Sequence, residues 1–161
     1  MSEKINIKLK INGVFVTLEV LAHQNLLRAL RDNYYWDVKC GCEVGECGTC
    51  TVLLDGQAVK SCTVLAAACD GHEIWTDKGL GLSTKLTARI QDAFVECGSV
   101  QCGFCTPGMV VAATDYLKNG GKPDRTAIRE AISGNLCRCT GYVKIVDAIY
   151  KVAKDIEEGL L

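Results

Sequence analysis

The sequence lacks several features that mark common protein classes. Its 18 basic and 19 acidic residues give a net charge of −1, so the composition does not suggest the basic face that a nucleic-acid partner needs. No apolar run is long enough to span a bilayer, and Met1–Lys8 shows no apolar signal region. We therefore expect a cytoplasmic protein with no nucleic-acid partner and no membrane insertion.

Residues that usually carry out catalysis are also scarce. The two histidines, His23 and His72, have no ligand spacing with each other or with the cysteines, and we expect them on the surface or in turns. No Ser/His/Asp arrangement and no glycine-rich nucleotide fingerprint stand out. We therefore predict no catalytic residue in this chain.

Cysteine, by contrast, is abundant, with 11 residues in a chain of 161. Thiols stay reduced in the cytoplasm, and the odd count does not suit a set of disulfides. Clustered cysteines in such a setting favour metal binding.

The first half of the chain shows the pattern of a small mixed domain. Residues 5–11 alternate apolar and polar side chains, Asn12-Gly13 is a strong hairpin signal, and residues 14–20 alternate again as the returning strand. A short helix over 25–32, a cysteine loop and further strands around 51–54, 59 and 74–76 complete the half. We predict one domain over residues 1–77.

The second half, residues 78–161, has helical periodicity after a predicted linker at 77–81. Four helices are expected: one capped by Ser83 or Thr84, one that starts at Thr106-Pro107, one capped by Asp124, and one from about residue 143. Because Cys105 and Cys139 come just before the second and fourth helices, we expect two helix N-termini to face one metal centre.

The first cysteine set is Cys42-x₄-Cys47-x₂-Cys50 followed by Cys62. This is the spacing of plant-type [2Fe–2S] proteins. Gly41, Gly45 and Gly48 would let the loop wrap closely around an anionic cluster. Zinc is the alternative, although the four-residue gap suits zinc knuckles poorly.

The second set is Cys102-x₂-Cys105 with Cys137-x-Cys139. A pair with one intervening residue is less usual for tetrahedral zinc. A thioredoxin-like redox motif is also unsuitable, because no βαβ pattern surrounds it. A second metal centre held by these four cysteines is therefore expected.

Three stretches that include these cysteines, residues 42–51, 101–108 and 134–142, resemble the small iron–sulfur subunit of the xanthine oxidase family of molybdenum hydroxylases. The resemblance extends from Ile5 to about Lys154. It implies an α+β fold, with an N-terminal plant-ferredoxin-like β-grasp domain followed by a C-terminal four-helix bundle. It also implies two [2Fe–2S] clusters, with all eight of the cysteines above as ligands.

The resemblance further implies a role and partners. The chain would be a non-catalytic electron-transfer subunit beside a molybdopterin-binding large subunit and an FAD-binding medium subunit. The bundle cluster would lie next to the molybdopterin, which Gln101 and Cys139 would contact, and the ferredoxin-like cluster would pass electrons to FAD.

Two other functions stay open from the sequence alone: a free-standing two-cluster ferredoxin and a zinc-stabilised interaction module.

Three cysteines are left over. We expect Cys69 and Cys97 in the core, while Cys40 lies close enough to Cys42 to replace it as a ligand. Tyr34-Tyr35-Trp36 is a candidate contact with a partner.

Overall fold

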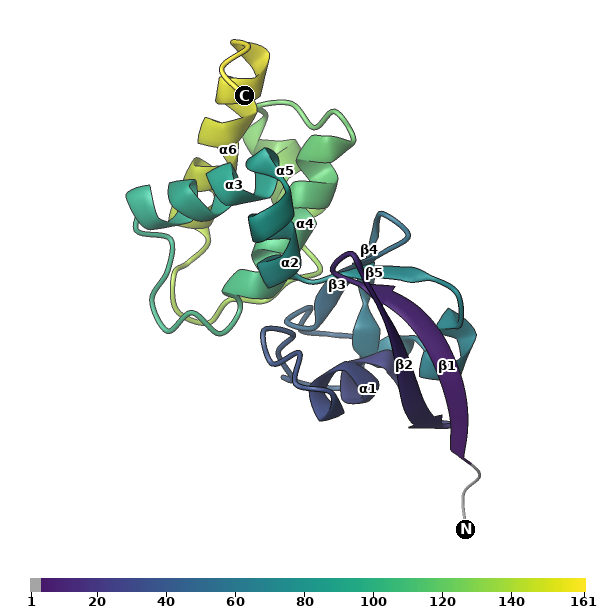
Figure 1. Ribbon diagram of the computed structural model, residues 1–161. Coiled ribbons are helices and arrows are strands. Elements are labelled where there is room, and N and C mark those ends of the chain that lie inside the picture. The colour runs from purple at the N-terminus through teal and green to yellow at the C-terminus, as the bar shows by residue number, and fades with distance from the viewer. Residues whose placement is uncertain (1–3) are drawn as a thin grey trace.

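The computed structural model describes residues 4–161 and shows two lobes, with the first described strand and the C-terminus on opposite sides (Figure 1). The predicted absence of a signal region falls partly on residues 1–3, which lie outside the described residues. The lobe near the N-terminus holds the sheet and one helix, and the other lobe is helical.

The sheet forms from the alternating segments that the sequence predicts. β1 (Lys4–Ile11) and β2 (Val14–Leu21) pair antiparallel through the turn at Asn12-Gly13, where φ is 51° and 83°. Both values lie in the left-handed region that hairpin turns of this kind require. β3 (Thr51–Leu54), β4 (Gln57–Lys60) and β5 (Glu73–Trp75) complete a sheet of order β2-β1-β5-β3-β4.

The helix α1 (Leu26–Asp32) closes one face of this sheet and buries Leu26, Leu27, Ala29 and Leu30. Asn25 caps it by accepting a hydrogen bond from the amide of Arg28. Two short 3₁₀ turns, η1 (Ser61–Thr63) and η2 (Ala66–Cys69), pack beside α1. This core fixes both ends of the cysteine loop that joins α1 to β3.

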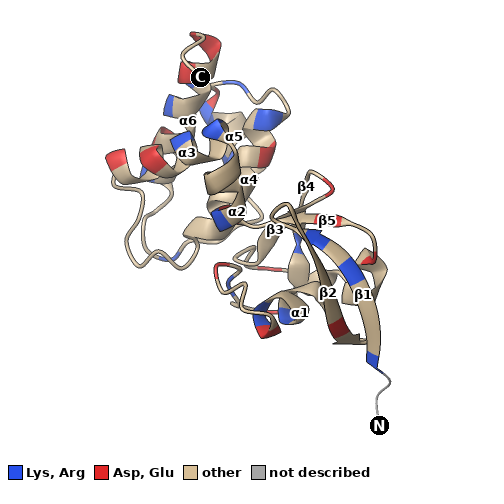
Figure 2. Cartoon of the chain, in the orientation of Figure 1, with Lys and Arg blue, Asp and Glu red and all other residues tan. Residues whose placement is uncertain are grey.

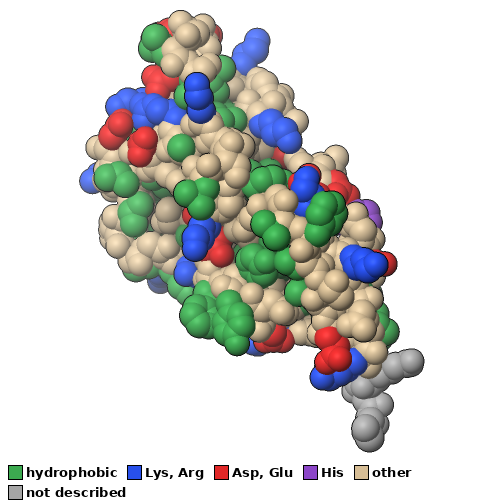
Figure 3. Space-filling view, viewed as in Figure 1, with side chains coloured by type: hydrophobic (Ala, Val, Ile, Leu, Met, Phe, Trp, Pro, Cys, Tyr) green, Lys and Arg blue, Asp and Glu red, His purple; other side chains and the backbone are tan. Residues whose placement is uncertain are grey.

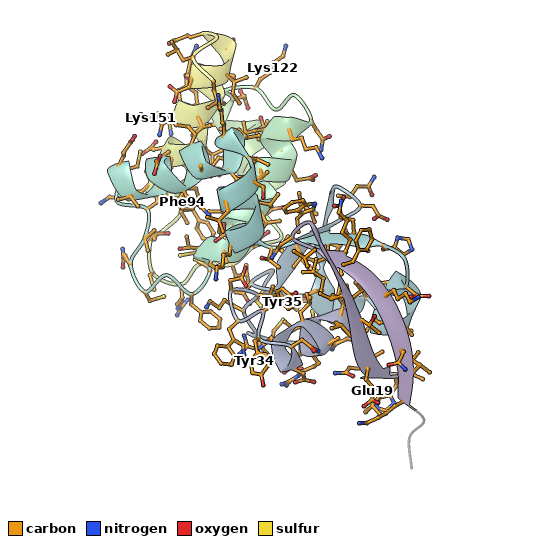
Figure 4. The ribbon with its side chains drawn as sticks, in the orientation of Figure 1. Glu19, Tyr34, Tyr35, Phe94, Lys122 and Lys151 are labelled. Atoms are coloured by element: carbon orange, nitrogen blue, oxygen red, sulfur yellow. The ribbon has the colours of Figure 1, made fainter. Side chains whose placement is uncertain are left out.

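The helical lobe contains α3 (Lys85–Glu96), α4 (Thr106–Lys118), α5 (Arg125–Ala131) and α6 (Val143–Glu157). Thr84 caps α3 and Asp124 caps α5, as predicted, because each side chain accepts from an amide in the first turn. The four helices share a second hydrophobic core that includes Phe94, labelled in Figure 4. The predicted α+β fold with a helical C-terminal half is confirmed.

The predicted linker at 77–81 is wrong, because this segment is the helix α2 (Asp77–Ser83). Thr76 caps α2 by accepting from the amide of Gly79. The two glycines permit close packing: a Cβ at Gly79 would collide with the side chain of Asn12, and one at Gly81 with that of Gln91. Gly79 therefore marks close contact between the two halves, and Gly81 marks close packing of α2 against α3.

Charges of both signs are spread over both lobes on the face shown in Figure 2. Among the described residues, no helix combines the length and apolar character that crossing a bilayer needs.

Candidate metal centres

The first cysteine set comes together at one end of the sheet lobe. Cys42, Cys47 and Cys50 lie in the loop between α1 and β3, and Cys62 lies in η1. Cys42 is within hydrogen-bonding reach of Cys47, and Cys62 of Cys50. The structure therefore gathers the four predicted thiols as two neighbouring pairs.

Backbone amides of the loop point at the sulfur of Cys42. The amides of Cys47 and Val44 donate to Cys42 Sγ at 3.3 Å and 3.5 Å. The Cys47 amide, followed by that of Val44, lowers the pKa of the Cys42 thiol to about 7. The loop thus stabilises a thiolate, which is the form that binds metal.

The glycines of the loop have the role expected from the sequence. Gly45 and Gly48 have φ of 81° and 66°, which L-residues rarely adopt. Gly41 has no room for a side chain, because a Cβ would lie 2.8 Å from Cys47 Sγ and 2.9 Å from Thr49 Oγ1. Close wrapping of the chain around the thiols therefore depends on these positions.

The second pair of this set is less exposed to water. Cys50 and Cys62 are both buried. Burial raises the pKa of the Cys62 thiol to about 11, and its neighbour Cys50 adds to the rise. Thiols this close disfavour each other's ionisation, so a bound cation is needed to hold them all as thiolates.

The second cysteine set lies at one end of the helical lobe. Cys102 and Cys105 are in the loop before α4, and Cys137 and Cys139 are in the loop between α5 and α6. The sulfurs of Cys139 and Cys102 are 3.6 Å apart, and Cys105 and Cys137 are within hydrogen-bonding reach. As predicted, two loops that precede helix N-termini meet here.

Local groups act on these thiols in opposite directions. The Phe104 amide and the Cys139 thiol lower the pKa of Cys102, whereas burial raises that of Cys105 to about 12. Burial also opposes ionisation of Cys137, but hydrogen bonds from the Thr140 hydroxyl and nearby amides lower its pKa overall. The hydroxyl of Tyr142 accepts from the Cys137 amide at 2.9 Å and holds the loop in place.

The arrangement in pairs distinguishes the two metals that the sequence left open. A tetrahedral zinc site draws all its ligands around one ion, whereas a [2Fe–2S] cluster takes four thiolates spread over two irons. The donor sets therefore fit [2Fe–2S] clusters.

Comparison with known proteins gives the same result. The family described as "2Fe-2S iron-sulfur cluster binding domain" matches residues 9–80, and the family described as "[2Fe-2S] binding domain" matches residues 76–150. The xanthine dehydrogenase iron-sulfur-binding subunit of Escherichia coli O157:H7 is 46% identical over 95% of this chain and 97% of its own. The nicotine 6-hydroxylase small subunit of Paenarthrobacter nicotinovorans is 44% identical over 92% of this chain and 89% of its own.

Two solved structures share the fold. A chain of quinoline 2-oxidoreductase from Pseudomonas putida 86 superposes with a TM-score of 0.89 and 42% identity, over 99% of this chain and 100% of that one. Aldehyde oxidoreductase from Desulfovibrio gigas matches with a TM-score of 0.86 and 37% identity, over 96% of this chain and 17% of that longer one. This chain belongs to the xanthine oxidase family as a small iron–sulfur subunit.

As a member of this family, the chain carries two [2Fe–2S] clusters and transfers electrons without catalysing a reaction itself. Its relatives are named as subunits of larger oxidoreductases, which disfavours a free-standing ferredoxin. Partner subunits are therefore part of its function.

The other predicted site residue, Gln101, lies on the surface directly before Cys102. Cys102 and Cys139 are themselves exposed. The three residues thus share one exposed edge of the helical lobe.

The remaining cysteines are not drawn into either set. Cys69 is 1% exposed in the first core, as expected. Cys97 is only half-buried, because it caps the end of α3. Cys40 donates to Glu43 Oε1 at 3.1 Å and is engaged there.

The aromatic cluster is exposed in part. Tyr34 and Trp36 contact each other edge to face, with centroids 5.6 Å apart, and are 79% and 60% exposed. Tyr35 instead packs against the first core. Figure 3 shows hydrophobic side chains gathered on this part of the surface, where Figure 4 labels Tyr34. A partner contact at this cluster stays a prediction.

Sequence reasoning missed Asn135, which lies within one of the motifs but was given no role. It is 6% exposed and contacts the loop of the other cysteine set. The sequence did show that Asn135 is a polar residue two positions before the predicted ligand Cys137. Its partner, the carbonyl oxygen of Gly48 in the other half, can be recognised only in the folded chain.

Proposed function

We propose that Cys42, Cys47, Cys50 and Cys62 hold one [2Fe–2S] cluster, and Cys102, Cys105, Cys137 and Cys139 the other. We further propose that electrons enter at the helical lobe, from molybdopterin on a large partner subunit, and leave from the sheet lobe to FAD on a medium subunit. Each bound cluster takes up and gives up one electron at a time. The protein's part is to hold, shield and align the two centres.

The proposal that electrons enter at the helical lobe rests on the exposed thiols there. Of the 11 cysteines, all within the described residues, only Cys102 and Cys139 are exposed. Exposed apolar side chains lie nearby in sequence: Val100, Phe104, Leu136 and Val143. Apolar residues around an opening to a redox centre suit a contact that a partner covers.

Within this contact we assign Gln101 and Cys139 to the pterin. A glutamine amide donates and accepts hydrogen bonds together, which matches the mixed edge of a pterin ring. Cys139 is exposed beside it and offers its sulfur as a further contact.

We place the complex in the cytoplasm. Cys40, Cys69 and Cys97 belong to neither ligand set and are free thiols, and a reducing compartment keeps such thiols reduced.

The direction of electron flow is tested by removing one ligand from each set in the assembled complex. Cys47→Ser should perturb the sheet-lobe cluster, yet substrate should still bleach the other cluster in a single turnover while steady-state acceptor reduction collapses. Cys105→Ser should block entry, so that substrate reduces neither cluster, although dithionite still reduces the surviving one.

A Cys69→Ser variant is the matched control, because Cys69 belongs to neither set. It should keep both signals and turnover. If Cys47→Ser abolished substrate-driven reduction of the helical-lobe cluster in a fully assembled, molybdenum-loaded complex, the proposed order would be reversed.

A further inference from the structure

A buried amide side chain joins the two cysteine loops. Asn135 lies two residues before Cys137, and its Nδ2 donates to the carbonyl oxygen of Gly48 at 2.8 Å. The same nitrogen is 3.2 Å from Thr51 Oγ1, and the Thr51 hydroxyl donates to the Gly48 carbonyl at 2.6 Å. Three groups from the two lobes thus form one small buried network.

A backbone hydrogen bond runs beside this network. The amide of Leu136 donates to the carbonyl oxygen of Cys47 at 2.9 Å. Cys47 belongs to the first cysteine set, and Leu136 immediately precedes Cys137 of the second. The two sets are therefore separated at this point by one hydrogen bond and the peptide units beside it.

Glycines let the backbone at Gly48 come close to the backbone of the helical lobe. A Cβ at Gly48 would collide with the carbonyl oxygen of Gly134, and a Cβ at Gly108 would collide with that of Gly48. Contact between backbones, which cannot change rotamer, defines the distance here more firmly than contact between long side chains.

The chemistry of position 135 requires an amide. The Gly48 carbonyl is an acceptor, so the buried group that faces it must donate. An aspartate would place a charged acceptor against that oxygen, and an alanine would leave the network without its donor.

We infer that Asn135 is a positioning residue that holds the two cluster loops at a fixed separation and so sets the rate of transfer between the clusters. This inference rests on the proposed ligand sets. Electron transfer between two fixed centres slows steeply as the gap widens, so a latch that prevents small movements of one lobe against the other has a direct effect on rate.

The test uses the assembled complex with Asn135→Ala and, separately, Thr51→Val, which removes only the hydroxyl of the network. Asn119→Ala is the matched control, because the exposed Asn119 amide donates to Asp115 at the end of α4 and contacts neither loop. Four quantities are measured: iron and sulfide content, the EPR signal of each reduced cluster, the magnetic interaction between the two, and the rate at which the second cluster is reduced after the first.

Asn135→Ala should keep both clusters and their individual signals, with a weaker or more dispersed magnetic interaction and several-fold slower transfer. Thr51→Val should weaken the magnetic interaction and slow the transfer as well, but by less. Asn119→Ala should match the unchanged protein. If Asn135→Ala loses a cluster, the inference is tested with Thr51→Val instead, by the magnetic interaction between the clusters and the rate of transfer between them.

Unchanged interaction and rate in the variants that keep both clusters would overturn the inference. Failure of the proposed function has a different signature, because it appears in the unchanged protein: two [2Fe–2S] signals would be missing, or substrate would fail to reduce the helical-lobe cluster first.

Discussion

The guanidinium of Arg28 donates two hydrogen bonds to the carboxylate of Glu43, from Nε at 2.7 Å and from Nη2 at 2.5 Å. Arg28 lies on α1, and Glu43 directly follows Cys42 in the cysteine loop. The hydrogen bonds from Arg28 hold the pKa of Glu43 below its ordinary value, so the pair stays ionised near neutral pH. Glu43 has φ of 58°, a left-handed conformation that non-glycine residues rarely adopt.

This pair predicts an order of variants at position 43. Glu43→Ala removes the ion pair and keeps a side chain in the left-handed region, whereas Glu43→Gly removes the pair but relieves the backbone. We therefore expect the first cluster to be lost fastest from Glu43→Ala, more slowly from Glu43→Gly, and slowest from the unchanged protein.

Loss of visible absorbance under a chelator measures these rates. Glu19→Ala is the control, because Glu19 pairs with Lys4 on the β1–β2 hairpin and not with the cysteine loop. Equal rates for the two Glu43 variants would show that backbone conformation at this position does not limit cluster retention.

Metal content gives a second prediction. Natively purified protein should contain about four iron and about four acid-labile sulfide ions per chain, because each [2Fe–2S] cluster holds two of each. Two distinct EPR signals should appear on reduction, since the two cysteine sets differ in burial and hydrogen bonding. A colourless protein with stoichiometric zinc would contradict both the cluster type and the pairing of thiols.

Local patterns predicted much of this fold. Alternation and Asn12-Gly13 identified the β1–β2 hairpin, and Thr84 and Asp124 were correctly expected as helix caps, because each depends on neighbours within a few residues. The spacing of the cysteines likewise divided eight of them into two sets of four. The thiols within each set lie close together in the structure.

Local patterns could not predict contacts between segments that are far apart in the sequence. Gly79 and Gly81 suggested a linker, yet they lie in α2, where Asn12 and Gln91 occupy the space that their side chains would need. Asn135 has a role only through Gly48, 87 residues away in the chain. The division into domains at residue 77 stays a prediction, with α2 packed against both α3 and α4.

Gln101 provides a third prediction. Gln101→Ala in the assembled complex should leave both EPR signals in place but slow reduction of the helical-lobe cluster by substrate, or loosen the molybdenum cofactor, because a hydrogen-bonding contact to the pterin is lost. Gln57→Ala, at an exposed position of β4, is the matched control. Unchanged turnover and cofactor content in Gln101→Ala would remove this residue from the site.

Asp77 leads to a prediction about pH. Its side chain lies in the first turn of α2, where Gln91 Nε2 donates to Asp77 Oδ1 at 2.9 Å. Burial raises the pKa of Asp77 to about 6; Asp37 adds to the rise, while Gln91 and Lys39 oppose it. The folded state therefore binds this proton more tightly than the unfolded chain does, for which the ordinary Asp pKa of about 3.9 applies.

A raised pKa in the folded state stabilises the protein below pH ~4, and this stabilisation is lost as the pH rises through about 6. Asp77→Asn keeps an oxygen acceptor for Gln91 and cannot ionise. We therefore expect it to raise the free energy of unfolding at pH 7.5, by at most ~3 kcal/mol at 1.36 kcal/mol per pKa unit. The gain should shrink steadily between pH 6.5 and 5. Urea denaturation at each pH measures it, with the exposed Asp92→Asn on α3 as control. A gain that did not vary with pH would show that Asn packs better at this position, and would contradict ionisation of the half-buried Asp77 carboxylate as the cause.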